Sequence, residues 1–127
     1  MRLHATLVEA LQQAMPGAGF PDVRPSHCQV LRGIENGGSR LTDLAARACM
    51  TKQSMGALVD HLEAGGYVER VRDRADARVK AIRLTPRGRD AAEAIAAVGA
   101  RIEGEWADKI GRDRLEQLRA ALAGITA

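Results

Sequence analysis

Aromatic residues are nearly absent from this sequence. Phe20, Tyr67 and Trp106 are the only three among 127 residues, so a hydrophobic core has to be built mainly from aliphatic side chains. Apolar residues make up 46% of the chain. That share is sufficient for one compact domain, or for one domain with helical extensions.

Cysteine and long apolar runs are also scarce. Cys28 and Cys49 are the only cysteines and form no CxxC pair, so we interpret both as buried free thiols rather than as a disulfide framework. No run approaches the roughly 20 apolar residues of a membrane-spanning helix. The N-terminus also lacks the charged-then-apolar order of a signal peptide. We therefore expect a cytoplasmic protein without membrane contact.

The motifs of common enzyme classes are missing as well. His4, His27 and His61 fall on three different expected helices, without an acidic or cysteine partner at metal-binding or catalytic spacing. The sequence contains no phosphate-binding glycine loop and no nucleophilic serine elbow. These absences argue against an enzyme and predict neither a cofactor nor a metal site.

What the sequence does contain is a pair of closely joined amphipathic helical patterns, Thr42–Ala48 and Thr51–Ala64. Thr42 and Thr51 are N-cap candidates, because a hydroxyl accepts from the unpaired amides of a first helical turn. Gly65-Gly66 is expected to end the second helix. Two short helices joined this closely pack as a helix-turn-helix. Their apolar faces are formed by Leu44, Ala45 and Ala48 in the first helix, and by Met55, Leu58, Val59 and Leu62 in the second.

The hydrophobic period then changes from helical to alternating. Tyr67–Val71 and Val79–Leu84 alternate apolar with polar residues, which predicts two strands around the polar tip Arg72–Arg78. Arg40-Leu41 is a candidate for a short edge strand beside them. The predicted fold is therefore mainly α with a small β-hairpin wing, and a winged helix is a common way to hold double-stranded DNA.

The positive charge is concentrated in this wing. The segment from Arg70 to Asp90 holds eight basic and three acidic residues, a net charge of +5, which leaves −2 for the rest of a chain whose total is +3. A clustered basic patch is typical of phosphate binding.

Helical patterns flank the winged helix on both sides. The first is an N-terminal helix that we expect to end at Pro16-Gly17. Ser26 and Gln29 have the spacing of a capping box before the next helix, and Thr85-Pro86 is a strong start for a long helix that Gly111 ends. The two terminal helices have apolar stripes that a winged helix does not need, so we predict a homodimer. Its interface residues are Leu3, Leu7, Leu11, Leu115, Leu118 and Leu122.

The sequence resembles the multiple antibiotic resistance regulator (MarR) family from about Pro25 to Gly88. The matching pattern is Leu62-Glu63-x-x-Gly66-Tyr67-Val68-x-Arg70, then Asp73-x-x-Asp76-x-Arg78, then Leu84-Thr85-x-x-Gly88. The resemblance implies dimerisation through the first and last helices and control of nearby promoters. It also implies regulation by a small-molecule effector or by thiol oxidation. The chain would then divide into a dimerisation helix and loop (1–24), a DNA-binding region (25–88) and C-terminal dimerisation helices (89–127), within one compact unit.

The second helix of the helix-turn-helix is expected in the major groove, with its N-terminal residues nearest the bases. We expect Asp60 and Glu63 to face away from the phosphates, and Asp73 and Asp76 to stabilise the wing. Gly56 either allows close backbone approach or is a tolerated surface glycine. The alternative function is a winged-helix module that binds another protein instead of DNA. The predicted DNA-binding residues are Thr51, Lys52, Gln53, Ser54 and Gly56 in the helix, and Arg72, Arg74, Arg78 and Lys80 in the wing.

Overall fold

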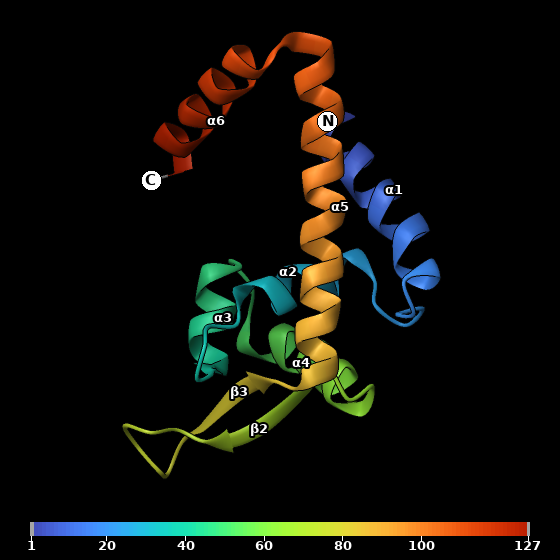
Figure 1. Cartoon of the computed structure of the whole chain (residues 1–127). Coiled ribbons are helices and arrows are strands. Elements are labelled where there is room, and N and C mark those ends of the chain that lie inside the picture. The colour runs from blue at the N-terminus through green and yellow to red at the C-terminus, as the bar shows by residue number, and fades with distance from the viewer. Residues whose placement is uncertain (1, 127) are drawn as a thin grey trace.

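The computed structural model describes the backbone of residues 2–126 and the side chains of residues 8–124. Within this range the protein is mainly helical with one small sheet, as the sequence predicts (Figure 1). The elements are α1 (Arg2–Gly17), α2 (Pro25–Gly33), β1 (Ser39–Arg40), α3 (Leu41–Arg47), α4 (Lys52–Ala64), β2 (Val68–Arg72), β3 (Lys80–Leu84), α5 (Pro86–Ile110) and α6 (Arg112–Thr126).

The long helix α5 connects the two ends of the molecule. The winged helix surrounds its first turns, whereas α6 folds back from its far end and α1 runs beside it (Figure 1). An ion pair of 3.0 Å between Arg119 and Glu103 ties α6 to α5. No helix within residues 2–126 is long and apolar enough to cross a membrane.

The sheet is antiparallel in the order β1-β3-β2. Val68 pairs with Leu84 and Arg72 with Lys80, so β2 and β3 form the expected hairpin within one residue of the predicted bounds. The expected edge strand also forms against β3, but at Ser39–Arg40, one residue earlier than predicted.

The core is largely aliphatic, as the composition requires. The exception is Tyr67, which is fully buried beside residues from all of α2, α4 and α5. Leu11 and Leu115 are buried within the single chain. The side chains of Leu3 and Leu7 lie outside the described residues.

Helix α1 ends at Gly17, as expected, and closes with a bond from Phe20 N–H to the Met15 carbonyl. Two predicted helix starts are wrong. Thr42 lies inside α3, because pairing of Ser39–Arg40 with β3 lets the helix begin immediately at Leu41.

The second error concerns the start of α2. Arg24 precedes the first residue of the helix, so Ser26 is already inside it and does not cap it. His27 contributes to the cap instead, because its Nδ1 accepts a hydrogen bond from the Arg24 N–H at 3.0 Å. The capping-box rule looks for Ser or Thr followed by Glu or Gln, so it did not predict that a histidine would take part in the cap.

The two cysteines lie in different environments, so the expectation that both are buried is wrong for Cys49. Cys28 is buried, and burial raises the pKa of its thiol to about 11. Cys49 is exposed in the turn between α3 and α4, with φ of 55°. Its N–H donates to the Ala46 carbonyl and the following Met50 N–H to the Ala45 carbonyl, the two bonds that close a helix through a left-handed residue.

The junction between wing and α5 depends on Gly88. A Cβ on this residue would lie only 1.9 Å from the carbonyl oxygen of Tyr67. That carbonyl accepts from the Thr85 N–H, while the Thr85 hydroxyl caps the helix by accepting from the Gly88 N–H. Helix α5 therefore begins in direct contact with the first residues of the hairpin.

Candidate nucleic-acid interface

Helix α4 presents a polar, exposed face at its N-terminal end. Thr51 caps it, since its Oγ1 accepts from the Ser54 N–H at 3.0 Å while its hydroxyl donates to Ser54 Oγ at 2.9 Å. Lys52 and Gln53 are exposed between them. The opposite side of the helix is fixed in the core by Met55, Val59 and Leu62. The exposed side chains can therefore make contacts without disturbing the fold.

Gly56 follows on the same helix and is partly buried. A Cβ there would meet only Leu41 Cδ2 at 3.9 Å, an ordinary contact. Internal packing thus leaves room for a methyl group, and no fold requirement explains the glycine.

Two carboxylates shape the wing tip. Asp73 Oδ2 accepts from Arg40 Nη2 at 2.8 Å and from the N–H groups of Ala75 and Asp76 at 3.1 Å. Asp76 Oδ1 accepts from the backbone N–H and the Nε of Arg78, at 3.0 and 3.1 Å. The bond from Arg40 lowers the pKa of Asp73, and the bond from Arg78 lowers the pKa of Asp76. Both carboxylates therefore stay charged and hold the tip in one shape.

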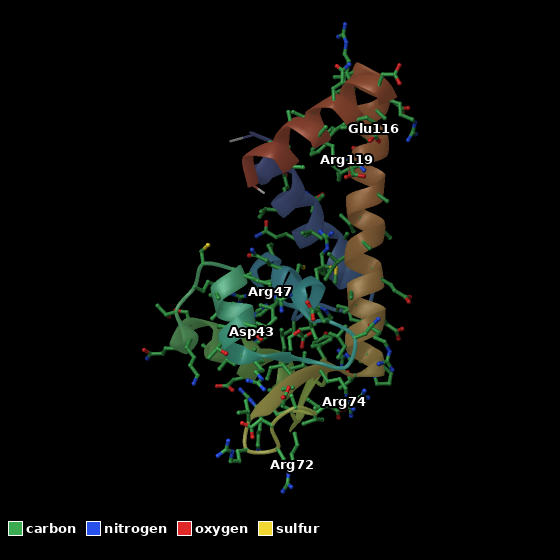
Figure 2. The ribbon with its side chains drawn as sticks, turned by 90° about the vertical axis from the view of Figure 1, so that its left-hand side faces the viewer. Asp43, Arg47, Arg72, Arg74, Glu116 and Arg119 are labelled. Carbon is green, nitrogen blue, oxygen red and sulfur yellow. The ribbon has the colours of Figure 1, made fainter. Side chains whose placement is uncertain are left out.

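The cations of the wing are not equivalent. Arg72, Arg74 and Lys80 are exposed, and so is Lys52 on α4; none of these four forms an ion pair among the described residues. Figure 2 shows Arg72 and Arg74 at the end of the molecule opposite Glu116 and Arg119 of α6. Arg78 is paired with Asp76, yet its side chain remains 90% exposed. These are the positive charges that a polyanion would meet first.

Other arginines of the segment Arg70–Asp90 have internal partners, so the basic patch is smaller than the sequence indicates. Arg83 Nε donates to Glu69 Oε1 at 2.9 Å on the neighbouring strand. Arg70 pairs with Asp60 and Glu63 of α4. These three carboxylates precede Arg70 in the sequence, and a charge count over a continuous segment leaves them out.

A polar cluster behind α4 was not expected from the sequence. The Tyr67 hydroxyl donates to the Asp22 carboxylate, and Arg87 Nη2 donates to the Tyr67 oxygen at 3.0 Å. The Tyr67 hydrogen bond is the main cause of the lowered pKa of Asp22, and burial is the main cause of the raised pKa of Tyr67. His61 Nε2 donates to the Asp22 backbone carbonyl at 2.8 Å. The loop before α2 is thereby fixed to the C-terminal half of α4.

Two of the histidines meet in this cluster, although they lie on separate helices. The rings of His27 and His61 stack with centroids 4.2 Å apart and an interplanar angle of 8°. Burial is the main cause of the lowered pKa of His27. No sequence spacing relates positions 27, 61 and 67, so the sequence carried no signal for this cluster. No group of three or more potential metal ligands occurs among the described residues.

Comparisons with known proteins agree with this geometry. Residues 22–79 match the model of the MarR family. CouR from Rhodococcus jostii RHA1, solved with p-coumaroyl-CoA, is 26% identical, with a TM-score of 0.80 over 98% of this chain and 86% of that one. The transcriptional repressor CouR on a 23-mer DNA duplex has the same identity and TM-score over 99% and 88% of the two chains.

A more distant structure shows the fold alone. FabT from Streptococcus pneumoniae, solved with DNA, is 17% identical, with a TM-score of 0.83 over 98% of this chain and 88% of that one. A search of curated protein sequences finds no significant match.

Proposed function

Because this chain belongs, through residues 22–79, to the MarR family, we propose that it is a transcriptional regulator that binds double-stranded DNA sequence-specifically and acts as a repressor. One observation carries the proposal. The exposed start of α4 and the exposed cations of the wing belong to two elements that contact each other, and the opposite side of α4 is fixed in the core. A regulator of chromosomal promoters acts where the chromosome is, so the proposed location is the cytoplasm.

The proposed division of labour follows from side-chain chemistry. Helix α4 enters the major groove, where Gln53 can pair with adenine and Lys52 with guanine acceptors or a phosphate. Arg72, Arg74, Arg78 and Lys80 of the wing bind phosphates or the minor groove, whose negative potential attracts arginine. Thr51 and Ser54 contribute hydroxyls near the phosphates, and Gly56 allows the backbone to approach the DNA.

We further propose a homodimer on a pseudo-palindromic operator. Ile110, Leu118 and Leu122 are 40%, 37% and 50% exposed, which leaves apolar surface at the α5–α6 end. Leu11 and Leu115 are already buried within one chain. The interface thus depends on the exposed leucines of α6 together with Leu3 and Leu7 of α1. Two α4 helices in successive major grooves require half-sites about 10 base pairs apart, centre to centre.

A small-molecule effector is part of the proposal, without an assigned chemistry. CouR has been solved both with DNA and with p-coumaroyl-CoA. The acyl-CoA is a ligand of CouR, and a sequence identity of 26% does not assign the same ligand to this chain.

The experiment measures affinity for a selected operator and for random duplex DNA across a salt titration. Gln53→Ala is expected to lose about 1–3 kcal/mol on the operator and little on random DNA, because base contacts carry the specificity. Arg74→Ala is expected to weaken both and to flatten the salt dependence. Arg101→Ala on the exposed side of α5 makes the same charge change away from the wing and serves as the matched control.

Two results contradict the proposal. If the wild-type chain binds no duplex even at low salt, it is a protein-interaction module instead. If Gln53→Ala leaves the ratio of operator to random affinity unchanged while Arg74→Ala collapses it, the wing reads the sequence and α4 does not.

A further inference from the structure

Arg70 differs from the exposed arginines of the wing, because it lies in the middle of β2 and faces α4. Its Nη2 lies 2.8 Å from Asp60 Oδ1, and its Nη1 bonds Glu63 Oε1. Only 26% of its side chain is exposed. The bond to Asp60 is the main cause of the raised pKa of the guanidinium. Like every arginine side chain, it stays charged at all working pH values.

This contact uses the shape of the guanidinium. Asp60 and Glu63 are three residues apart and share one face of α4, and the two Nη atoms of one planar group reach both. Within the described part of the chain, these are the only side-chain hydrogen bonds that connect α4 with the strands of the wing. Arg70 therefore connects α4, which is proposed to enter the major groove, with the wing, which is proposed to bind the phosphates.

The same contact changes the charge that DNA meets. Asp60 and Glu63 are exposed on the helix that approaches the duplex. Even if both carboxylates face away from the phosphates, two uncompensated negative charges on this helix would repel the phosphate backbone. With Arg70 between them the local charge falls from −2 to −1, and the exposed cations Lys52 and Arg72 act on the phosphates with less opposition.

We propose that Arg70 is a positioning residue: it does not bind DNA, but fixes the wing relative to α4 and shields Asp60 and Glu63 from the phosphates. This rests on the proposed DNA-binding function. Both carboxylates are largely exposed, and ion pairs of exposed groups contribute little to stability, so variants at Arg70 are expected to fold. The competing role is that of an ordinary phosphate contact.

A mutant cycle separates the two roles. Arg70→Gln is made in the wild-type chain and in an Asp60→Asn/Glu63→Gln background, and binding to the selected operator is followed against salt. In the wild-type background we expect a loss of about fivefold to tenfold, from unshielded carboxylates near phosphates. In the neutralised background we expect less than about a twofold loss and an unchanged salt slope, because no counter-charge is needed there.

Arg72→Gln provides the matched control on the same strand, two residues away, because Arg72 forms no ion pair with any residue whose side chain the structure describes. It is expected to cost affinity equally in both backgrounds and to reduce the salt slope by about 0.9, the value of one phosphate contact. Arg70→Lys adds a second test, since lysine binds a phosphate as a point charge but cannot bridge two carboxylates as a fork. We expect this variant to bind at least threefold more weakly than the wild type.

The inference is overturned if Arg70→Gln behaves like Arg72→Gln in both backgrounds, or if Arg70→Lys binds DNA like the wild type. Circular dichroism and thermal unfolding of each variant establish that it is folded. Failure of the wild-type chain to bind any duplex is a different outcome: it refutes the proposed function itself, and the role of Arg70 with it.

Discussion

Replacing Gly88 with alanine tests the fold. We expect this substitution to destabilise the protein, whereas the same substitution elsewhere in a helix usually stabilises it. Replacing a helical glycine with alanine normally stabilises a protein by about 0.5–1 kcal/mol, because alanine loses less backbone freedom on folding. At Gly88 the added Cβ would lie 1.9 Å from the Tyr67 carbonyl oxygen and 3.2 Å from Leu84 Cδ2.

The size of the penalty follows from these distances. A carbon–oxygen contact normally needs about 3.3 Å, so α5 and the start of the hairpin have to separate by more than an ångström. Overpacking of this kind costs about 1–3 kcal/mol. The Thr85 N–H bond to the same carbonyl would also weaken, at about 1 kcal/mol. After the helix-propensity gain, we expect Gly88→Ala to lose about 1–3 kcal/mol, or about 4–12 °C in Tm.

Gly99 and Gly104 lie in the same helix and supply matched controls. A Cβ at either position meets nothing within 4 Å in the chain, so Gly99→Ala and Gly104→Ala are expected to raise Tm by about 2–4 °C. The assay is thermal and urea unfolding of the variants at one protein concentration. A Gly88→Ala protein as stable as the wild type would refute the close contact between α5 and Tyr67.

Three further predictions concern the terminal helix, the histidine stack and the cysteines. Deletion of residues 112–127 is expected to yield a monomer that no longer binds operator, as measured by sedimentation and gel shift; a soluble truncated chain with normal binding would contradict the dimer. His27 has a folded pKa below its unfolded value of about 6.5, so its stability contribution is complete above that pH and declines as pH falls below it. Urea unfolding from pH 7.5 to 5 should show that slope in the wild type and a weaker one in His27→Gln; equal slopes would argue against it. Iodoacetamide is expected to label the exposed Cys49 but not the buried Cys28, as measured by peptide mass spectrometry. Cys49→Gly should raise Tm and Cys49→Ser should not, because glycine adopts the positive φ of this position without strain.

Local sequence patterns predicted the architecture well. The change from helical to alternating period located the helix-turn-helix and the hairpin, and the hydroxyl caps Thr51 and Thr85 stand where expected because a cap depends on residues three positions away. Thr42 failed as a cap because a long-range pairing, Ser39–Arg40 with β3, determined where α3 begins.

The side-chain partners of the candidate site were harder to predict. Asp76 and Arg78 are only two residues apart, and Asp76 was expected to stabilise the wing. Arg70 and Asp60 are ten residues apart on different elements, and Asp22 and Tyr67 are separated by 45. Their meeting is a consequence of tertiary packing, which leaves no periodic signal in the sequence. The exposure of Cys49 was missed as well, because this residue follows the predicted helix Thr42–Ala48 and its burial is decided by the shape of the turn to α4.

Helix α5 also has a mechanical consequence. It spans 25 residues without a break, from the wing to α6. At a rise of 1.5 Å per residue its length is about 37 Å, so a rotation of about 5° at the α6 end displaces the opposite end by about 3 Å. That distance is close to the 3.4 Å that separates successive phosphates along one strand, measured parallel to the duplex axis. A rigid rod of this length acts as a lever, in which a tilt too small to disturb packing at one end moves the other by a whole base-pair step.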